Sequence, residues 1–143
     1  MSKVSLTQKV SVPLCDFYAV VTDYERYPEF ISEIKKAKVI SEKPKRVEFT
    51  LELMKTFHYV LEMKEKSPSE VSWTLVESNL FQKNTGGWKL KEKKGVLEAT
   101  YTLDVEFGFL VPSFMTNPLV KRDLPKMITR FEARAISQLS KMV

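Results

Sequence analysis

The chain has 143 residues, a mass of 16.6 kDa and a net charge of +5. Its composition, 43% hydrophobic and 29% charged, excludes a disordered or collagen-like chain, and its single cysteine excludes an intrachain disulfide. No apolar run approaches the ~20 residues that span a bilayer. The length predicts one domain over residues 1–143, and the amino terminus lacks the apolar segment of a signal peptide, so we expect a cytoplasmic protein.

The amino-terminal region is predicted to form a strand and then short helices. Residues 4–12 alternate apolar and polar side chains, which indicates a strand. Pro13 suits the start of a helix, and residues 14–24 place apolar side chains at helical spacing. Pro28 is expected to end or bend this helix, and a second short helix or turn is predicted over residues 30–34.

The middle of the chain is predicted to be a series of strands. The segments with alternating apolar and polar residues are 47–53, 57–63, 71–75, 88–90 and 97–109. Turn residues separate them at 66–69 and 94–95, and residues 84–87 are predicted to form a turn or a bulge. Because short turns join consecutive strands, we expect an antiparallel meander. Because each strand has one apolar face, the sheet has one face that another element must cover.

The carboxy-terminal segment changes to helical spacing. An apolar stripe runs along it, formed by Leu124, Met127, Ile128, Phe131, Ala135, Leu139 and Met142. The opposite face is predicted to be polar, with Lys126, Arg130, Arg134, Gln138 and Lys141. Asp123 is predicted to cap this helix, and Pro125 is predicted to lie in its first turn.

These elements predict an α+β fold. A curved antiparallel sheet of six to seven strands wraps around the long C-terminal helix, and two short helices follow the first strand. A helix is ~10 Å wide, whereas six strands span roughly 24–29 Å, so one helix does not cover the sheet. The space between the curled sheet and the helix is therefore either an aromatic-lined cavity or an ordinary dense core.

The side chains predicted to line such a cavity share an inward orientation, and most are aromatic. They are Phe30, Phe49, Leu51, Phe57, Tyr59, Leu61, Trp73, Trp88, Tyr101, Leu103, Val105, Met127 and Phe131. The predicted inward stripes carry no carboxylate, lysine or arginine, which argues against hydrolytic or redox chemistry. Tyr59 and Tyr101 are able to donate a hydrogen bond to a ligand carbonyl.

Both ends of the chain resemble a known superfamily. Asp23, Tyr27, Pro28 and Phe30 match a motif of Asp, three residues, Tyr-Pro, one residue and Phe, and the last helix carries a similar closing run. The chain thus resembles the START-like helix-grip (SRPBCC) superfamily, in its polyketide cyclase and coenzyme-Q-binding branch. The resemblance implies a helix-grip fold and an internal cavity for a lipid, a quinone or a polyketide. Residues 31–34 depart from the quinone-binding pattern, so the resemblance does not specify ubiquinone.

The remaining candidate residues favour structural roles. His58 is the only histidine and faces away from the apolar stripe of its strand, so neither catalysis nor a metal site is expected there. Cys15 is predicted to be a small buried residue of the first helix. Asp23 is expected to accept backbone hydrogen bonds in the turn that leads to Tyr27. No catalytic residue, cofactor or metal is predicted.

Three functions are consistent with this sequence. The preferred hypothesis is a protein that binds or transports a hydrophobic small molecule. The second is a cyclase or dehydratase without a metal or nucleotide cofactor, and the third is a module that contacts the ribosome. Basic clusters at residues 35–38, 43–46, 89–94 and 121–122 favour solvated loops and strand edges, with contact to an anionic membrane surface or to RNA as the alternative.

Overall fold

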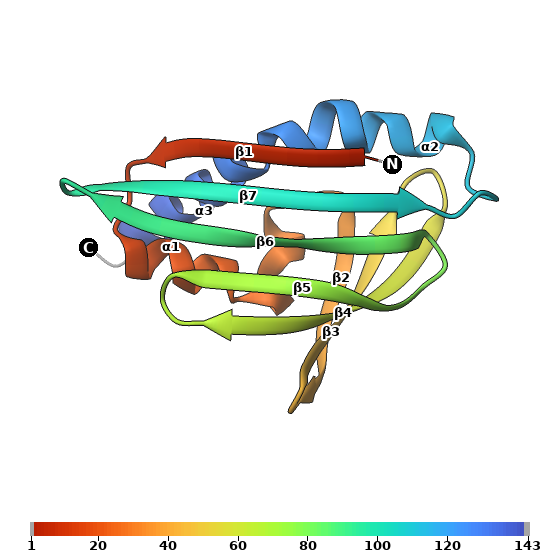
Figure 1. The fold of residues 1–143 in the computed structure, drawn as a ribbon, viewed down its shortest axis with the longest axis horizontal. Helices are drawn as coiled ribbons and strands as arrows, with labels where there is room; N and C mark the ends of the chain where they lie inside the picture. Colours follow the sequence, from red (N-terminus) through yellow and green to blue (C-terminus); the bar gives the residue numbers. More distant parts are fainter. Residues whose placement is uncertain (1, 142–143) are drawn as a thin grey trace.

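The protein forms a curved antiparallel sheet of seven strands that packs against a long carboxy-terminal helical segment (Figure 1). The computed structural model describes residues 2–141. The strand order is β1-β7-β6-β5-β4-β3-β2, so β2 to β7 form a meander and β1 pairs with β7. The strands are β1 Ser2–Val10, β2 Ile34–Glu42, β3 Lys45–Glu52, β4 Thr56–Lys66, β5 Glu70–Ser78, β6 Phe81–Lys93 and β7 Val96–Phe107. The predicted α+β helix-grip fold is confirmed.

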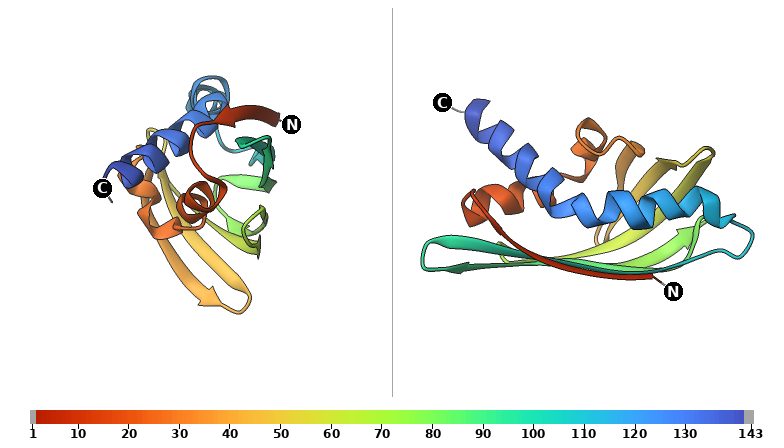
Figure 2. Two further views of the ribbon diagram at one scale, coloured as in Figure 1. Left: turned by 90° about the vertical axis from the view of Figure 1, so that its left-hand side faces the viewer. Right: turned by 90° about the horizontal axis from the view of Figure 1, so that it is seen from above.

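The helices lie on one side of the sheet (Figure 2). Helix α1 (Leu14–Val21) and the 3-10 helix η1 (Tyr24–Glu29) follow β1. Of the two alternatives predicted over residues 30–34, the structure has the turn, and the second helix comes earlier, at η1, where it contains Pro28. The two backbone N–H groups that follow η1 both donate to the carbonyl of Tyr27, which ends the helical turn.

A nearly continuous helical segment spans residues 113–141 and joins two stretches that the sequence predicts, a helical turn over residues 112–119 and the long helix from residue 124. It consists of α2 Ser113–Pro118, the π-helical turn η2 Leu119–Asp123, the 3-10 turn η3 Leu124–Lys126 and α3 Met127–Lys141. Pro118 lies where the α-helix changes to a π-helical turn, and Pro125 lies next to the change from the π-helical to the 3-10 turn. The N–H groups that these prolines lack therefore do not end the helical segment. Met142 of the predicted stripe lies outside the described residues.

Charged residues of this segment contact the region around η1. Asp123 does not cap the helix as predicted, because its buried carboxylate pairs with Arg130. Arg130 also pairs with Glu33, and Arg134 pairs with Glu29. The side chains of the two arginines are only 23% and 12% exposed, so the predicted polar face is partly buried. These ion pairs hold η1 and the loop after it against α3.

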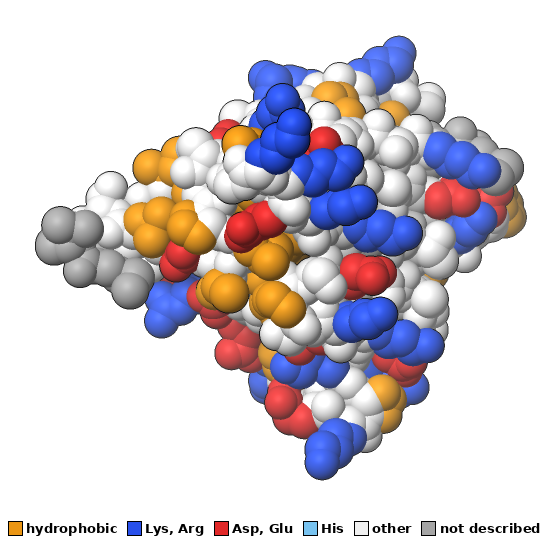
Figure 3. Space-filling model, turned by 60° about the vertical axis from the view of Figure 1, so that its left-hand side comes forward, with side chains coloured by type: hydrophobic (Ala, Val, Ile, Leu, Met, Phe, Trp, Pro, Cys, Tyr) orange, Lys and Arg blue, Asp and Glu red, His pale blue; other side chains and the backbone are white. Residues whose placement is uncertain are grey.

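Strand β2 lies at the edge of the sheet, and sequence alternation does not reveal it. Ile34 and Ala37 are buried, but two register shifts in the pairing with β3 interrupt the period of two. The basic cluster at residues 35–38 lies on this strand, which agrees with a solvated strand edge. On the face drawn in Figure 3, lysines and arginines are spread over the surface with aspartates and glutamates among them.

Residues 84–87 lie inside β6 and not in the predicted turn. A Cβ atom on Gly86 would lie 2.3 Å from the backbone oxygen of Thr102 and 2.9 Å from the ring of Trp73. Only glycine therefore lets the Trp73 indole lie directly against β6 at this point. The glycine pair, which suggested a turn, instead marks a close approach of three strands.

Aromatic side chains fill the space where α1 and α3 meet the sheet. Phe17, Trp88 and Phe131 are each at most 2% exposed. The ring centroids lie 5.4 Å apart for Phe17 and Trp88 and 4.9 Å apart for Trp88 and Phe131. We call this group the packed end. Two residues lie at the surface against prediction. Phe109 ends the apolar side of the strand predicted over residues 97–109, but it follows the end of β7 and is 86% exposed. Cys15, which was predicted to be buried, is exposed in the first turn of α1.

Candidate functional site: an apolar cavity

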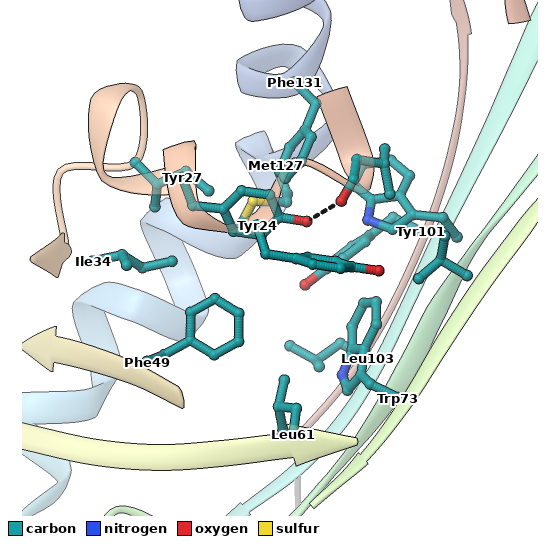
Figure 4. Packing of buried hydrophobic residues seen from close by; sticks show 14 of the residues in the cluster. Tyr24, Tyr27, Ile34, Phe49, Leu61, Trp73, Tyr101, Leu103, Met127 and Phe131 are labelled. Carbon is teal, nitrogen blue, oxygen red and sulfur yellow. Dashed lines mark hydrogen bonds between the residues drawn. The ribbon is translucent and has the colours of Figure 1, made fainter. Parts of the chain in front are cut away.

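A cavity of about 110 Å³ lies between the sheet and the helical segment. Figure 4 shows Phe49, Trp73, Tyr101 and Phe131 converging on one space from different elements. The lining residues are Tyr27, Ile31, Glu33, Ile34, Phe49, Leu51, Tyr59, Leu61, Met63, Trp73, Phe81, Asn84, Trp88, Tyr101, Leu103, Val105, Phe107, Leu119, Leu124, Met127 and Phe131. Pockets for drug-sized ligands enclose roughly 300–1,000 Å³, so only a small ring system or a short chain fits without movement.

Most of the residues predicted to line a cavity surround this one. Phe30 does not, because its ring packs 5.0 Å from the ring of Phe131 and lies under the guanidinium of Arg134. Phe57 is buried but also lies outside the lining. The residues predicted and found at the cavity are Phe49, Leu51, Tyr59, Leu61, Trp73, Trp88, Tyr101, Leu103, Val105, Met127 and Phe131. Their contact with a ligand stays a prediction.

The family motif divides into cavity and surface residues. Tyr27 lines the cavity, whereas Asp23 and Pro28 do not. The expected hydrogen bonds from the backbone to the Asp23 side chain are wrong. The side chain makes no cap hydrogen bond and pairs with Arg26 instead. The Tyr27 hydroxyl donates to the backbone carbonyl of Val21, so it joins η1 to α1. The motif therefore shapes the turn that closes this side of the cavity.

Sequence reasoning missed the lining residues of irregular segments. Glu33 lies in the loop before β2, and Asn84 lies where a turn was predicted. Some of the missed residues, such as Met63, lie on the apolar side of a predicted strand. That position is the one sequence signal that indicated an inward orientation for them. The lining residues that were not predicted are Ile31, Glu33, Ile34, Met63, Phe81, Asn84, Phe107, Leu119 and Leu124.

The cavity contains polar groups that have no protein partner. The Nε1 of Trp73 donates to Oδ1 of Asn84 over 3.0 Å, so the Asn84 amide nitrogen points elsewhere. Among the described residues, this nitrogen and the hydroxyls of Tyr59 and Tyr101 have no hydrogen-bond partner, although all three side chains are at least nine-tenths buried. The apolar wall thus presents unused hydrogen-bond donors to the cavity.

Burial keeps the two tyrosines neutral. Desolvation raises the pKa of both the Tyr59 and the Tyr101 hydroxyl well above the ordinary value of 10.0. A charge on Tyr59 would raise the pKa of Tyr101 further. At neutral pH both groups therefore act as donors and not as bases.

Among the described residues that line the cavity, one is charged, and it is Glu33. Its carboxylate accepts from Nη1 and Nη2 of Arg130 over 2.7 and 3.3 Å. Burial favours the neutral acid, but the hydrogen bonds from Arg130 and Ser32 outweigh it, and the pKa of Glu33 is lowered. An ionised carboxylate held by an arginine is poorly suited to remove a proton from a substrate.

Other reactive groups lie away from the cavity. His58 is exposed, as predicted, and its Nδ1 lies 3.3 Å from the Thr50 hydroxyl. Within residues 2–141, no three His, Cys, Asp or Glu side chains are placed to share a metal ion. The site as built offers apolar contact and neutral donors, which suits the recognition of an apolar molecule that carries an oxygen acceptor.

Comparison with known proteins agrees with this geometry. Residues 10–132 match the family described as polyketide cyclase / dehydrase and lipid transport. The chain belongs to this family. No curated protein sequence is significantly similar to this member of the polyketide cyclase / dehydrase family. Along the part of the chain that the structure describes, no helix is both long and apolar enough to cross a bilayer.

Several solved structures share the fold of this polyketide cyclase / dehydrase family member. A START superfamily protein from Mycobacterium smegmatis superposes with a TM-score of 0.79 at 20% identity, covering 95% of this chain and 98% of that one. The Zhui aromatase/cyclase from Streptomyces sp. R1128 superposes with a TM-score of 0.81 at 12% identity, covering 96% and 94%. These similarities show a START-like fold.

Proposed function

We propose that this protein binds a hydrophobic small molecule that carries an oxygen acceptor, such as a polyketide or an isoprenoid quinone, in the apolar cavity. The observation that supports the proposal is the set of unpaired donors on Tyr59, Tyr101 and Asn84 inside an apolar wall. All three donors face the cavity and keep some accessible surface, unlike the fully buried unpaired atoms of the described residues, the Tyr18 hydroxyl and Asp104 Oδ1. A ligand carbonyl or hydroxyl oxygen placed between these groups would accept hydrogen bonds that a purely apolar ligand leaves unmade.

The apolar lining would supply most of the affinity. Burying apolar ligand surface contributes about 25 cal/mol per Å², before the cost of ordering the ligand. Because the cavity holds only about 110 Å³, a ligand larger than a small ring system requires lining side chains to move. Met63 and Met127 are the flexible lining residues best able to do so, since an unbranched thioether changes rotamer at low cost.

The family and its solved relatives support a ligand of this class. The family description joins cyclases and dehydrases with lipid transport, and one relative with the same fold is named an aromatase/cyclase. Polyketides and quinones carry several ring oxygens, whereas a fatty acyl chain has oxygen only at its head. The donors deep in the cavity therefore favour an oxygenated ring over a plain acyl chain.

Binding is best tested with two probes of the same shape. We expect 1-tetralone, which has a ketone, to bind at least several-fold more tightly than tetralin, which lacks it. Trp73 and Trp88 are the only tryptophans and both line the cavity, so their fluorescence reports occupancy directly. Equal affinity for the two probes, or no binding of either, would contradict the proposal. Solvent extraction of the purified protein and mass spectrometry would then identify the natural ligand.

A second candidate function is a cyclase or dehydratase. Neutral donors on Tyr59 and Tyr101 would polarise a substrate carbonyl, which favours enolisation and ring closure. The carboxylate of Glu33 is already held by Arg130, so the lining lacks a free base and binding is the simpler function. Turnover of a polyketide-like substrate that falls in Tyr59→Phe and Tyr101→Phe, with binding retained, would favour catalysis. On the face drawn in Figure 3, acidic side chains lie among the basic ones, so this face gives the predicted ribosome contact no comparable support.

A further inference from the structure

One end of the molecule exposes large apolar side chains. Phe109 and Leu110, in the loop between β7 and α2, are 86% and 85% exposed. Phe114 on α2 is 59% exposed, and Met54 in the turn between β3 and β4 is 79% exposed. We call these four residues the apolar tip. Water-exposed side chains of this size in one place mark a contact site on a folded protein.

The loop and the turn that carry these residues lie next to each other. Figures 1 and 2 show the β3–β4 turn at the same end of the molecule as the start of α2 and the loop before it. Met54 has a φ of 70°, a left-handed conformation that glycine or asparagine adopts more easily. An exposed methionine in a conformation that disfavours it has no role in the core.

The helical segment that follows the loop carries exposed positive charge. Between residues 108 and 127 the only acidic residue is Asp123, which is 4% exposed and pairs with Arg122 and Arg130. Lys121 and Lys126 on the same helical segment are exposed. The segment thus shows solvent a set of apolar side chains and cations without an exposed carboxylate. This is the pattern of segments that lie in the interface of an anionic bilayer.

We propose that the apolar tip docks this protein onto a lipid bilayer that contains anionic lipids. Two neighbouring side chains at the end of a loop suit insertion among acyl chains, whereas a protein partner is usually met by a flatter patch. Phe107 and Leu119 line the cavity; Phe107 directly precedes this loop, and Leu119 follows α2. The inference extends the proposed function, because the ligand would pass between the bilayer and the cavity at this end.

The test is flotation of the full chain with vesicles of phosphatidylcholine alone or with added phosphatidylserine. We expect wild-type protein to bind the anionic vesicles and Phe109→Ser/Leu110→Ser to bind at least tenfold more weakly, since apolar insertion is lost. Lys121→Glu/Lys126→Glu should weaken binding to the anionic vesicles about tenfold or more and leave the neutral ones unchanged. Ile136→Ser on α3, which removes another exposed apolar side chain, is the matched control and should bind normally.

Several results would overturn docking. Docking is contradicted if the wild-type protein binds neither vesicle, or if Ile136→Ser loses as much vesicle binding as the tip variant. It is also contradicted if the protein forms a dimer in solution that Phe109→Ser/Leu110→Ser abolishes, because the tip would then contact a second copy of the chain. The 1-tetralone titration separates this proposal from the ligand proposal. A tip variant that binds 1-tetralone like wild type is folded, so its loss of vesicle binding supports docking. If wild type floats through its tip but does not bind 1-tetralone, the ligand proposal fails and docking stands.

Discussion

The two ends of the cavity are built differently. At the packed end, Phe17, Trp88 and Phe131 are almost fully buried and their rings interlock. At the other end, Phe107 and Leu119 line open space, and the chain continues into the exposed apolar tip. Trp88 and Phe131 also line the cavity, so the packed end both stabilises the fold and forms one wall of the site. Substitutions at the packed end should therefore cost much more stability than substitutions at the apolar tip.

The largest expected effect is at the packed end. Phe131→Ala should lower the free energy of unfolding by about 3–5 kcal/mol, because it removes a buried ring and leaves a void. Phe114→Ala at the apolar tip is the matched control and should change it by less than about 0.5 kcal/mol. Urea denaturation measures both. Similar losses in the two variants would mean that the ends do not differ as described.

Gly86→Ala tests the close approach of strands beside the cavity. The added Cβ would meet the Thr102 carbonyl and the Trp73 ring, so we expect a loss of about 1–3 kcal/mol and a changed Trp73 fluorescence spectrum. Gly108→Ala, whose Cβ would find nothing nearer than 3.7 Å, is the control and should be nearly neutral. If Gly86→Ala is as stable as wild type, steric exclusion is not why glycine occupies this position.

Glu33→Gln tests the ion pair that joins the loop before β2 to α3. Because Arg130 keeps its contact with Asp123, we expect a moderate loss of about 1–2 kcal/mol. The exposed pair of Lys35 and Glu52 is the control, and Glu52→Gln should cost less than about 0.5 kcal/mol. Equal effects of the two changes would show that the Glu33 pair contributes no more than a surface contact.

The same ion pair predicts a pH dependence of stability. The pKa of Glu33 is lowered in the folded state from its ordinary value of 4.5, so the unfolded chain binds this proton more readily. The stabilisation is therefore complete above pH 4.5 and is lost as the pH falls through the lowered pKa of the folded state. Urea midpoints measured from neutral to acid pH should converge for wild type and Glu33→Gln. A difference that stays constant over this range contradicts the assignment.

The regular elements could be predicted from the sequence, and the irregular ones could not. Alternation along β7 fixes which side chains face inward, so Tyr101 was placed correctly at the cavity. In β2, register shifts interrupt the alternation, and the strand was missed. Asn84 was placed in a turn because the glycines after it suggest one. Their actual cause is the contact between Gly86 and Trp73, which are distant in sequence and meet only in the folded sheet.

The smallest predicted effect separates satisfied from unsatisfied hydroxyls. The Tyr27 hydroxyl donates to the Val21 carbonyl, whereas the Tyr59 and Tyr101 hydroxyls have no partner among the described residues. Tyr27→Phe should therefore lower stability by about 1 kcal/mol or slightly more, because it leaves a buried carbonyl unpaired. Tyr59→Phe and Tyr101→Phe should change the stability of the empty protein by less than about 0.5 kcal/mol, since neither lost hydroxyl has a protein partner. The same two changes should reduce the preference for 1-tetralone over tetralin. If they instead destabilise the empty protein as much as Tyr27→Phe does, these hydroxyls already have partners and are not reserved for a ligand.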